Sequence, residues 1–358
     1  MTSLRTTLSR FLLLILALGT IAGGCDDRLL PPDDDAVVGK GLIVYNKMDG
    51  STNPDFDGIE LIDSLGVSRR TIDTRSFIVA PPYKGFAVLS DSTFDGIDIV
   101  ELETGAVVRN LPIATGNTSH SIDHYSPAIS PLGDRIAYSI NYRDSLFDES
   151  STRRIHIVKT DGSSPITLDI GAARETRIRF SPDGSRIAFF DKSEESNGWL
   201  YVARIDGTDV RKIADVGHVG GDGDMIFSWS PDGTEIVYSD FENGEFQIVV
   251  AAVDGSGTRL LDVTGYTPDW SPDGETILYT SVEGALTTIP ADGSAAPVDL
   301  GINAIYSTWS PDGRKILCFE FDPGIDLDEQ FPSLVVLDAE THARGITVER
   351  AYDGYWYR

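Results

Sequence analysis

A four-residue motif, Ser-Pro-Asp-Gly, recurs through the second half of the chain and constrains its fold more than any other feature. Copies begin at Ser181, Ser230, Ser271 and Ser310, and Ser130-Pro131-Leu132-Gly133 is a variant copy upstream. Two residues after each copy a short apolar run begins, as in Ile236-Val237-Tyr238. Repetition every 40 to 50 residues or so, read from these starts, predicts an array of similar units rather than one irregular core.

The motif encodes a tight turn between two antiparallel strands. Proline presets φ at the second turn position, aspartate tolerates the third and bonds back to the backbone, and glycine permits the positive φ that closes the turn. A large side chain directly precedes three copies, at Trp229, Trp270 and Trp309, while Phe180 and Ile129 take the same place in the other two. Each unit therefore has one large anchor for packing on its first strand.

A second turn follows in each of these units. Asp-Gly pairs occur at 161–162, 206–207, 254–255 and 292–293, each after a segment of strand character such as 246–250. Two hairpins make a unit of four strands, and repeated four-stranded units are typical of β-propeller blades.

Weaker copies extend the array toward the N-terminus, where the first unit lacks its first strand. Trp356, near the C-terminus, offers the missing anchor. We therefore expect an all-β, seven-bladed propeller whose ring is closed by the C-terminal strand, which would remove an open sheet edge. The expected units are 39–73 with 354–358, 76–113, 126–169, 176–215, 225–263, 267–300 and 305–349. Six or eight blades remain alternatives if a weak copy is misread.

The segment Trp-Ser-Pro-Asp-Gly followed by Ile-x-Tyr or Ile-x-Phe resembles the WD-like repeat of TolB-type propellers. The resemblance is strong over residues 126–319 and weak over 39–125. TolB carries a small α/β domain before its propeller, where this chain has only a short polar stretch. The resemblance implies a fold, and the fold does not imply a function.

The first residues read as an export signal. Arg5 and Arg10 precede an apolar run over 11–18, which is short for a membrane span. Ala22-Gly23-Gly24-Cys25 resembles the lipobox of bacterial lipoproteins, which implies a signal peptide over 1–24 and a lipid on Cys25. An ordinary signal peptide with an incidental thiol is the alternative.

The resemblance to lipoproteins sets the expected organisation and location. Residues 25–38 are expected to be an acidic, flexible tether and 39–358 the propeller domain. The protein would then sit in the bacterial cell envelope, membrane-anchored by its N-terminal lipid and facing the periplasm or the exterior. Cys318 lies in the apolar run 316–319 and is expected to be a core residue.

The net charge of -27 restricts the classes of molecule that the protein is expected to bind. Phosphate contacts need clustered Lys and Arg, so nucleic acid is not expected, nor is an anionic surface. An envelope protein or a polymer of neutral or cationic character fits better.

The acidic residues concentrate in the expected connections between second and third strands. These connections hold 20 Asp or Glu among 65 positions, about twice the proportion of the whole chain, 56 of 358. Loops held by a rigid scaffold commonly carry binding sites. The expected binding residues are Asp144, Asp148, Glu149, Glu320, Asp322, Asp326, Asp328 and Glu329. The alternative is that this acidity only keeps the protein soluble.

Histidines suggest one further site. Three histidines and two aspartates in the connections between units could bind a divalent transition metal, since imidazole and carboxylate suit such ions; they are His120, His124, His218, Asp222 and Asp224. Histidines exposed to solvent are the alternative. No other cofactor is expected.

The sequence favours a non-catalytic binding scaffold. It contains no Gly-x-Ser-x-Gly, His-Glu-x-x-His or Cys-x-x-Cys motif, so no catalytic residue is assigned. The alternative is a metal-dependent polysaccharide lyase or hydrolase that resembles oligogalacturonate lyases, in which histidines beside the channel hold a metal.

Overall fold

The computed structural model describes most of the chain from residue 43 onward. The described residues are 43–48, 56–62, 69–72, 78–83, 86–90, 96–102, 104–112, 127–143, 151–169, 177–192, 198–217, 227–242, 244–324, 332–349 and 351–356. Within these ranges the regular structure consists of β-strands, as expected for an all-β fold. A search of the same ranges for a helix long and apolar enough to cross a membrane finds none.

The strands of the described residues form five hydrogen-bonded sheets, of which four have four strands. One has the order β26 (Ala351–Trp356), β1 (Ile43–Met48), β2 (Phe56–Ile62), β3 (Arg69–Ile72). The next has β4 (Ile78–Tyr83), β5 (Phe86–Ser90), β6 (Gly96–Glu101), β7 (Val107–Pro112). The third has β8 (Ala128–Ile129), β9 (Arg135–Arg143), β10 (Ser151–Lys159), β11 (Ile166–Asp169). The fourth has β12 (Ile178–Phe180), β13 (Arg186–Lys192), β14 (Gly198–Arg204), β15 (Arg211–Val216).

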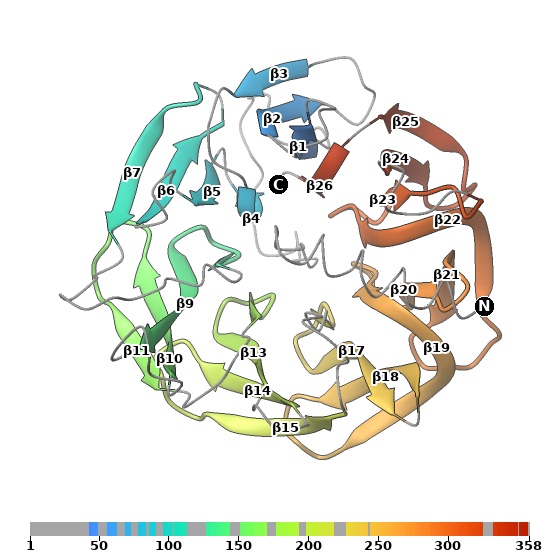
Figure 1. The fold of residues 1–358 in the computed structure, drawn as a ribbon. Helices are drawn as coiled ribbons and strands as arrows, with labels where there is room; N and C mark the ends of the chain where they lie inside the picture. Colours follow the sequence, from blue (N-terminus) through green and yellow to red (C-terminus); the bar gives the residue numbers. More distant parts are fainter. Residues whose placement is uncertain are drawn as a thin grey trace.

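The fifth sheet has ten strands in chain order. They are β16 (Phe227–Trp229), β17 (Glu235–Glu242), β18 (Glu245–Ala252), β19 (Thr258–Trp270), β20 (Thr276–Ser281), β21 (Ala285–Pro290), β22 (Val298–Trp309), β23 (Lys315–Glu320), β24 (Ser333–Asp338) and β25 (Arg344–Val348). Figure 1 shows the sheets arranged around a common axis, with β26 and β4 close to it and β3, β7 and β15 at the rim.

Two connections in the ten-stranded sheet differ from the expected loops. The units 225–263, 267–300 and 305–349 were expected to be separate, but β19 and β22 each run without interruption from one unit into the next. β19 pairs with β18 up to Thr264 and with β20 from Gly265 onward. Left-handed residues within the strand, Asp262 (φ 54°) and Thr267 (φ 52°), change its direction while the flanking backbone stays extended.

The Ser-Pro-Asp-Gly motifs form the hairpin turns that their chemistry predicts. In the copy that joins β16 to β17, the Gly233 N–H donates to the Ser230 carbonyl at 2.9 Å, and Gly233 has φ +70°. The Ser230 side-chain oxygen accepts from the Glu235 N–H at 2.9 Å, which fixes the start of the second strand. These bonds explain why the motif marks every such turn among the described units from β12 onward.

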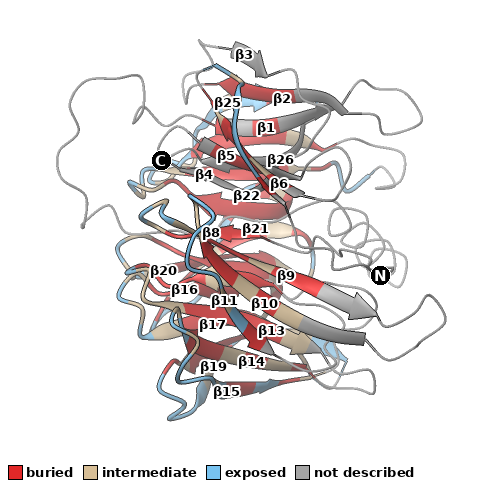
Figure 2. Ribbon diagram, turned by 90° about the vertical axis from the view of Figure 1, so that its left-hand side faces the viewer, coloured by how far each residue is buried: buried red, intermediate tan, exposed pale blue. Residues whose placement is uncertain are grey.

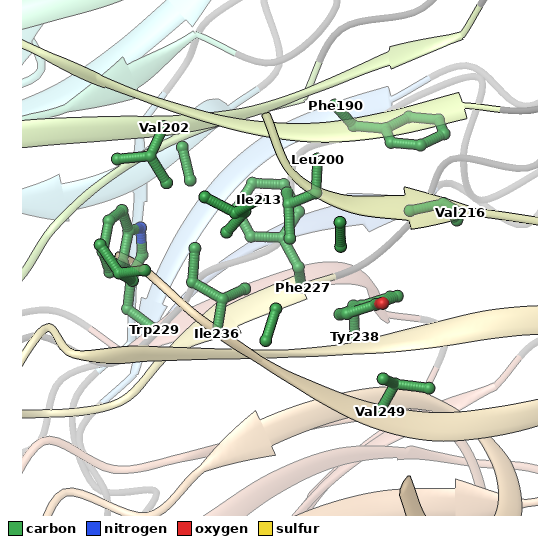
Figure 3. Packing of buried hydrophobic residues seen from close by; sticks show 14 residues of the cluster. Phe190, Leu200, Val202, Ile213, Val216, Phe227, Trp229, Ile236, Tyr238 and Val249 are labelled. Carbon is green, nitrogen blue, oxygen red and sulfur yellow. The ribbon is translucent and has the colours of Figure 1, made fainter. Parts of the chain in front are cut away.

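The core lies between neighbouring sheets. Figure 3 shows one such layer, in which Leu200 and Val202 of one sheet meet Trp229, Ile236 and Tyr238 of the next. Figure 2 shows that the buried residues follow the strands from sheet to sheet. Each anchor tryptophan therefore fills a space between two units, as its position in the repeat predicts.

Cys318 belongs to this core, as expected from its apolar surroundings in the sequence. It is fully buried in β23 and makes no disulfide. Burial raises the pKa of its thiol, so the residue behaves as a small apolar group.

The strand nearest the C-terminus lies beside the strand nearest the N-terminus among the described residues. β26 pairs antiparallel with β1, with Trp356 opposite Ile43 and Tyr355 opposite Val44. The sequence predicted this partner for residues 354–358, and the strand extends further upstream, to Ala351.

Candidate binding surface

The four strands of each unit run up and down in succession, so the ring of sheets has two different faces. Turns from the first to the second strand and from the third to the fourth lie at one end, which we call the turn face. Connections from the second to the third strand and between units lie at the other end, which we call the loop face. The loop face is the one for which the sequence predicts binding.

Carboxylates of the turn face are used within the turns themselves. The Ser230 hydroxyl donates to Asp232 Oδ1 at 2.7 Å, and the same oxygen accepts from the Thr234 N–H at 3.0 Å. Asp183, Asp273 and Asp312 repeat both contacts. In the second kind of turn, bonds from Ser256 hold the pKa of Asp254 below its ordinary value. The acidity of the turn face is therefore structural.

The loop face carries acids of a different kind at the end of the β17–β18 hairpin. Glu242 and Glu245 stand directly opposite each other in the strand register, and both are exposed. Like charges directly opposite one another in a sheet destabilise the pairing. Unlike the aspartates of the turn face, these two carboxylates are not explained by the formation of a turn.

Three aromatic rings cluster at the same end of this hairpin. Because successive residues of a strand point to opposite faces, Phe241 and Phe246 lie on the other face of the hairpin from the two glutamates. Phe241 and Phe246 have ring centroids 4.7 Å apart, and Phe246 and Tyr266 are also 4.7 Å apart. All three side chains are partly exposed. We call Phe241, Glu242, Glu245, Phe246 and Tyr266 the aromatic-acidic patch. Aromatic faces and carboxylates both attract cations.

The patch is joined to the preceding unit through Asp240. The Gly217 N–H, just after β15, donates to Asp240 Oδ1 at 2.7 Å. Burial raises the pKa of the Asp240 carboxyl despite this bond, and the charge of Glu242 acts in the same direction. A positive charge near Glu242 would relieve part of that unfavourable field.

The neighbouring unit combines an aromatic ring and a carboxylate with a lysine of the same chain. Lys212 Nζ lies 5.2 Å above the Trp199 ring and forms an ion pair with Asp215. The same carboxylate also accepts a hydrogen bond from Trp199 Nε1 at 2.9 Å. Here an aromatic ring and a carboxylate hold a lysine of the protein itself.

Two of the predicted binding residues lie in the described part of the loop face. Glu320 ends β23, and its carboxylate is held by Arg344, whose Nη1 lies 2.9 Å from Oε2. Asp322 is exposed, and its Oδ1 accepts from the Gly324 N–H at 2.8 Å. The other predicted binding residues lie outside the described residues: Asp144, Asp148, Glu149, Asp326, Asp328 and Glu329.

The predicted lipidation and metal positions also lie outside the described residues: Cys25, His120, His124, His218, Asp222 and Asp224. In the part of the chain that is described, no group of three or more His, Cys, Asp or Glu is arranged to hold a metal ion.

Sequence reasoning missed the three aromatic residues of the patch. The signal was available in residues 241–246, where a Phe and a Glu flank Asn243-Gly244 on each side. Asn-Gly between two strands favours a tight hairpin turn, which places the two Phe and the two Glu opposite each other. Tyr266 carried no such signal, because its contact with Phe246 depends on the register of β19 on β18.

Comparisons with known proteins agree with this architecture. The family model of the TolB beta propeller domain matches residues 97–301. An uncharacterized peptidase, YuxL of Bacillus subtilis (strain 168), is 35% identical over 113 residues, which are 31% of this chain and 16% of the peptidase. The chain thus spans a small part of that relative's length.

Solved structures are similar in fold at low sequence identity. TolB from Acinetobacter baumannii is 14% identical with a TM-score of 0.53, over 88% of this chain and 66% of TolB. An oligogalacturonate lyase in complex with manganese is 14% identical with a TM-score of 0.63, over 88% of each chain. A puromycin hydrolase is 16% identical with a TM-score of 0.63, over 94% of this chain and 57% of the hydrolase. Because the family model covers more than half of the sequence, the chain belongs to the TolB beta propeller domain family.

Proposed function

We propose that this protein is a non-catalytic binding scaffold whose loop face takes a cationic segment of a partner in the cell envelope. The observation that carries the proposal is the pair of facing, exposed glutamates, Glu242 and Glu245, at a hairpin end whose other face carries three partly exposed aromatic rings. A lysine or arginine between the two carboxylates would remove their repulsion. On the other face of the hairpin, the rings offer a second contact to the same segment through cation–π attraction.

The Trp199–Lys212–Asp215 contacts support this choice of ligand. They show that the fold can present a ring and a carboxylate at a spacing that suits one ammonium group. The turn face offers no equivalent among its described motif turns, because their aspartates accept bonds from the turn itself.

Seven blades in a closed ring form the scaffold in this proposal. The ten-stranded sheet supports the count, because β19 and β22 each serve as the last strand of one unit and the first of the next. Pairing of β26 with β1 supports closure. A closed ring keeps its loops at fixed positions, which suits a binding role.

Anchorage in the envelope is part of the same proposal. It rests on the lipobox-like Ala22-Gly23-Gly24-Cys25 and the polar stretch that follows it. Replacement of Cys25 by Ser should release the protein from membrane fractions. Unchanged retention of this variant would contradict lipid anchoring.

Binding is tested with a short peptide of lysine residues as the probe. The double variant Glu242→Gln/Glu245→Gln should weaken binding about tenfold or more, since two carboxylate contacts to an ammonium are lost. Asp254→Asn/Asp292→Asn is the matched control, with the same change of net charge on the turn face. Equal weakening by both pairs would mean that net charge alone binds the peptide, and would contradict the proposal.

A stability measurement separates binding from misfolding. Removal of the facing charges should leave the unliganded protein as stable as the wild type or more stable, by about 0.5 kcal/mol. A variant that loses both stability and binding would point to a structural role for the glutamates. Metal-dependent turnover of an oligogalacturonate by the mature protein would instead favour the lyase alternative.

A further inference from the structure

The residue directly before the anchor aromatic lies on the innermost strand of each unit. In the four units from β12 onward this residue is Arg179, Ser228, Asp269 and Thr308. Three of these side chains meet at Asp269, in the inner half of β19. Its side chain is 4% exposed, so a carboxyl group is enclosed in the middle of the fold.

Both oxygens of Asp269 are bonded, and the donors come from the units on either side. The Ser228 hydroxyl of β16 donates to Oδ1 at 2.8 Å. On the other side, the Thr308 hydroxyl of β22 donates to Oδ2 at 2.9 Å, and the Trp309 N–H donates to the same oxygen at 3.1 Å. One carboxyl group therefore connects the inner strands of three successive units.

The network extends one bond further into the backbone. Ser228 Oγ accepts from the Trp270 N–H at 3.4 Å, so the serine is held by the same strand to which it donates. An apolar residue in place of Asp269 would leave the two hydroxyls and the Trp309 N–H without this acceptor. Buried polar groups left without partners are costly.

None of the groups that are hydrogen-bonded to the Asp269 carboxylate carries a positive charge. Its neighbours on β16 and β22 are neutral hydroxyl and N–H groups, and its pairing partner on β20 is Leu278. The positive charge that acts on it is Arg179 of β12, which itself lies 5.8 Å above the Phe227 ring. Burial raises the pKa of Asp269, and the hydrogen bonds and Arg179 oppose that shift only in part.

We propose that Asp269 is a proton-sensitive clip, which holds three successive blades together at the central axis and makes their cohesion depend on pH. The sign follows from the raised folded-state pKa. The unfolded chain loses this proton near the ordinary value of about pH 4, whereas the folded chain keeps it to a higher pH. The contribution to stability is therefore greatest in acid and declines as the pH rises toward the folded-state pKa.

Urea unfolding of the full chain tests the proposal through Asp269→Asn. The amide keeps the shape of the side chain, its oxygen can accept from Trp309 and Thr308, and its NH2 group can face Ser228 Oγ. From about pH 4.5 upward, until the pH passes the folded-state pKa of Asp269, the unfolding equilibrium constant of the wild type should rise relative to that of the variant, by up to about tenfold per pH unit. If the ratio of the wild-type and Asp269→Asn unfolding constants does not change with pH, Asp269 does not link stability to pH and the proposal is overturned.

Asp232→Asn is the matched control on the turn face. Although partial burial opposes it, bonds from Ser230 and Thr234 lower the pKa of Asp232, so its contribution is lost only as the pH falls below about 4. The ratio of the unfolding equilibrium constants of the wild type and Asp232→Asn should therefore not change over the same pH range. A matching rise for both variants would assign the effect to general charge and overturn the proposal.

The hydrogen bonds have a separate test that keeps the carboxyl group. Ser228→Ala and Thr308→Val each remove one donor from a neighbouring blade, and each should raise the unfolding equilibrium constant about five- to tenfold. Unchanged stability in both variants would overturn the clip, whether or not Asp269→Asn folds.

Discussion

Two glycines of this protein are required for different physical reasons. Gly233 closes a hairpin turn with φ +70°, and a Cβ there would meet only Pro182 Cδ at 3.8 Å. Gly217 lies where β15 approaches the end of β17, and a Cβ there would overlap the Phe241 carbonyl oxygen. The first site has the space for a side chain but not the backbone conformation. The second lacks the space.

Alanine substitutions should separate these two requirements. Gly233→Ala should lower the free energy of unfolding by about 1 to 2 kcal/mol, the cost of a left-handed alanine. Gly217→Ala should cost more, because the backbone of two units must move apart, and it should disturb the nearby patch. Urea unfolding measures both. Equal costs would show that the overlap at Gly217 is relieved without a shift of the backbone.

At the scale of elements, arginines on the outermost strands join neighbouring units at the turn face. Arg259 of β19 donates to the Ala291 carbonyl at 2.7 Å and pairs with Glu235 at 3.0 Å. Arg109 of β7 and Arg211 of β15 make the same kind of bond to the following unit, at 3.1 and 3.5 Å. Arg259 therefore joins, on the outer side, two of the three units whose inner strands meet at Asp269.

Arg259→Met tests the outer bonds, because methionine keeps much of the apolar stem. We expect a loss of about 0.5 to 1.5 kcal/mol in the free energy of unfolding. Arg211→Met is the comparison, and its longer bond to Asp254 predicts a smaller loss. The opposite order in urea unfolding would contradict the role assigned to Arg259.

At the scale of the whole molecule, β26 pairs with the strand nearest the N-terminus among the described residues. β26 covers the edge of β1, and both belong to the same sheet as β2 and β3. An uncovered β1 would present unpaired N–H and C=O groups to other molecules.

Deletion of residues 351–358 should therefore open the ring in our proposal. We expect a loss of several kcal/mol in the free energy of unfolding, together with concentration-dependent association, since a sheet edge is exposed. Urea unfolding and size-exclusion chromatography measure the two effects. A deletion variant that is monomeric and as stable as the wild type would show that β26 does not close the fold.

The repeat units were predictable because their signals are local. Ser230, Asp232 and Gly233 determine their turn through bonds and dihedral angles within a few residues, so the sequence predicts four-stranded units, hairpins and the anchor at Trp229. The candidate site was predictable only in part. Acidic loops were visible in the composition, but nothing in the sequence separated the aspartates that build turns from the glutamates that face each other.

The turns, the strand content and the family follow from the sequence alone, since each copy of the motif carries its own geometry. The contacts between side chains of different strands follow only from the fold: Tyr266 packs against Phe246, Arg344 pairs with Glu320, and Asp269 lies between Ser228 and Thr308. The physical reason is distance along the chain. Contacts between residues about 20 to 40 positions apart depend on the angle and register at which strands and blades pack, and no local pattern encodes these.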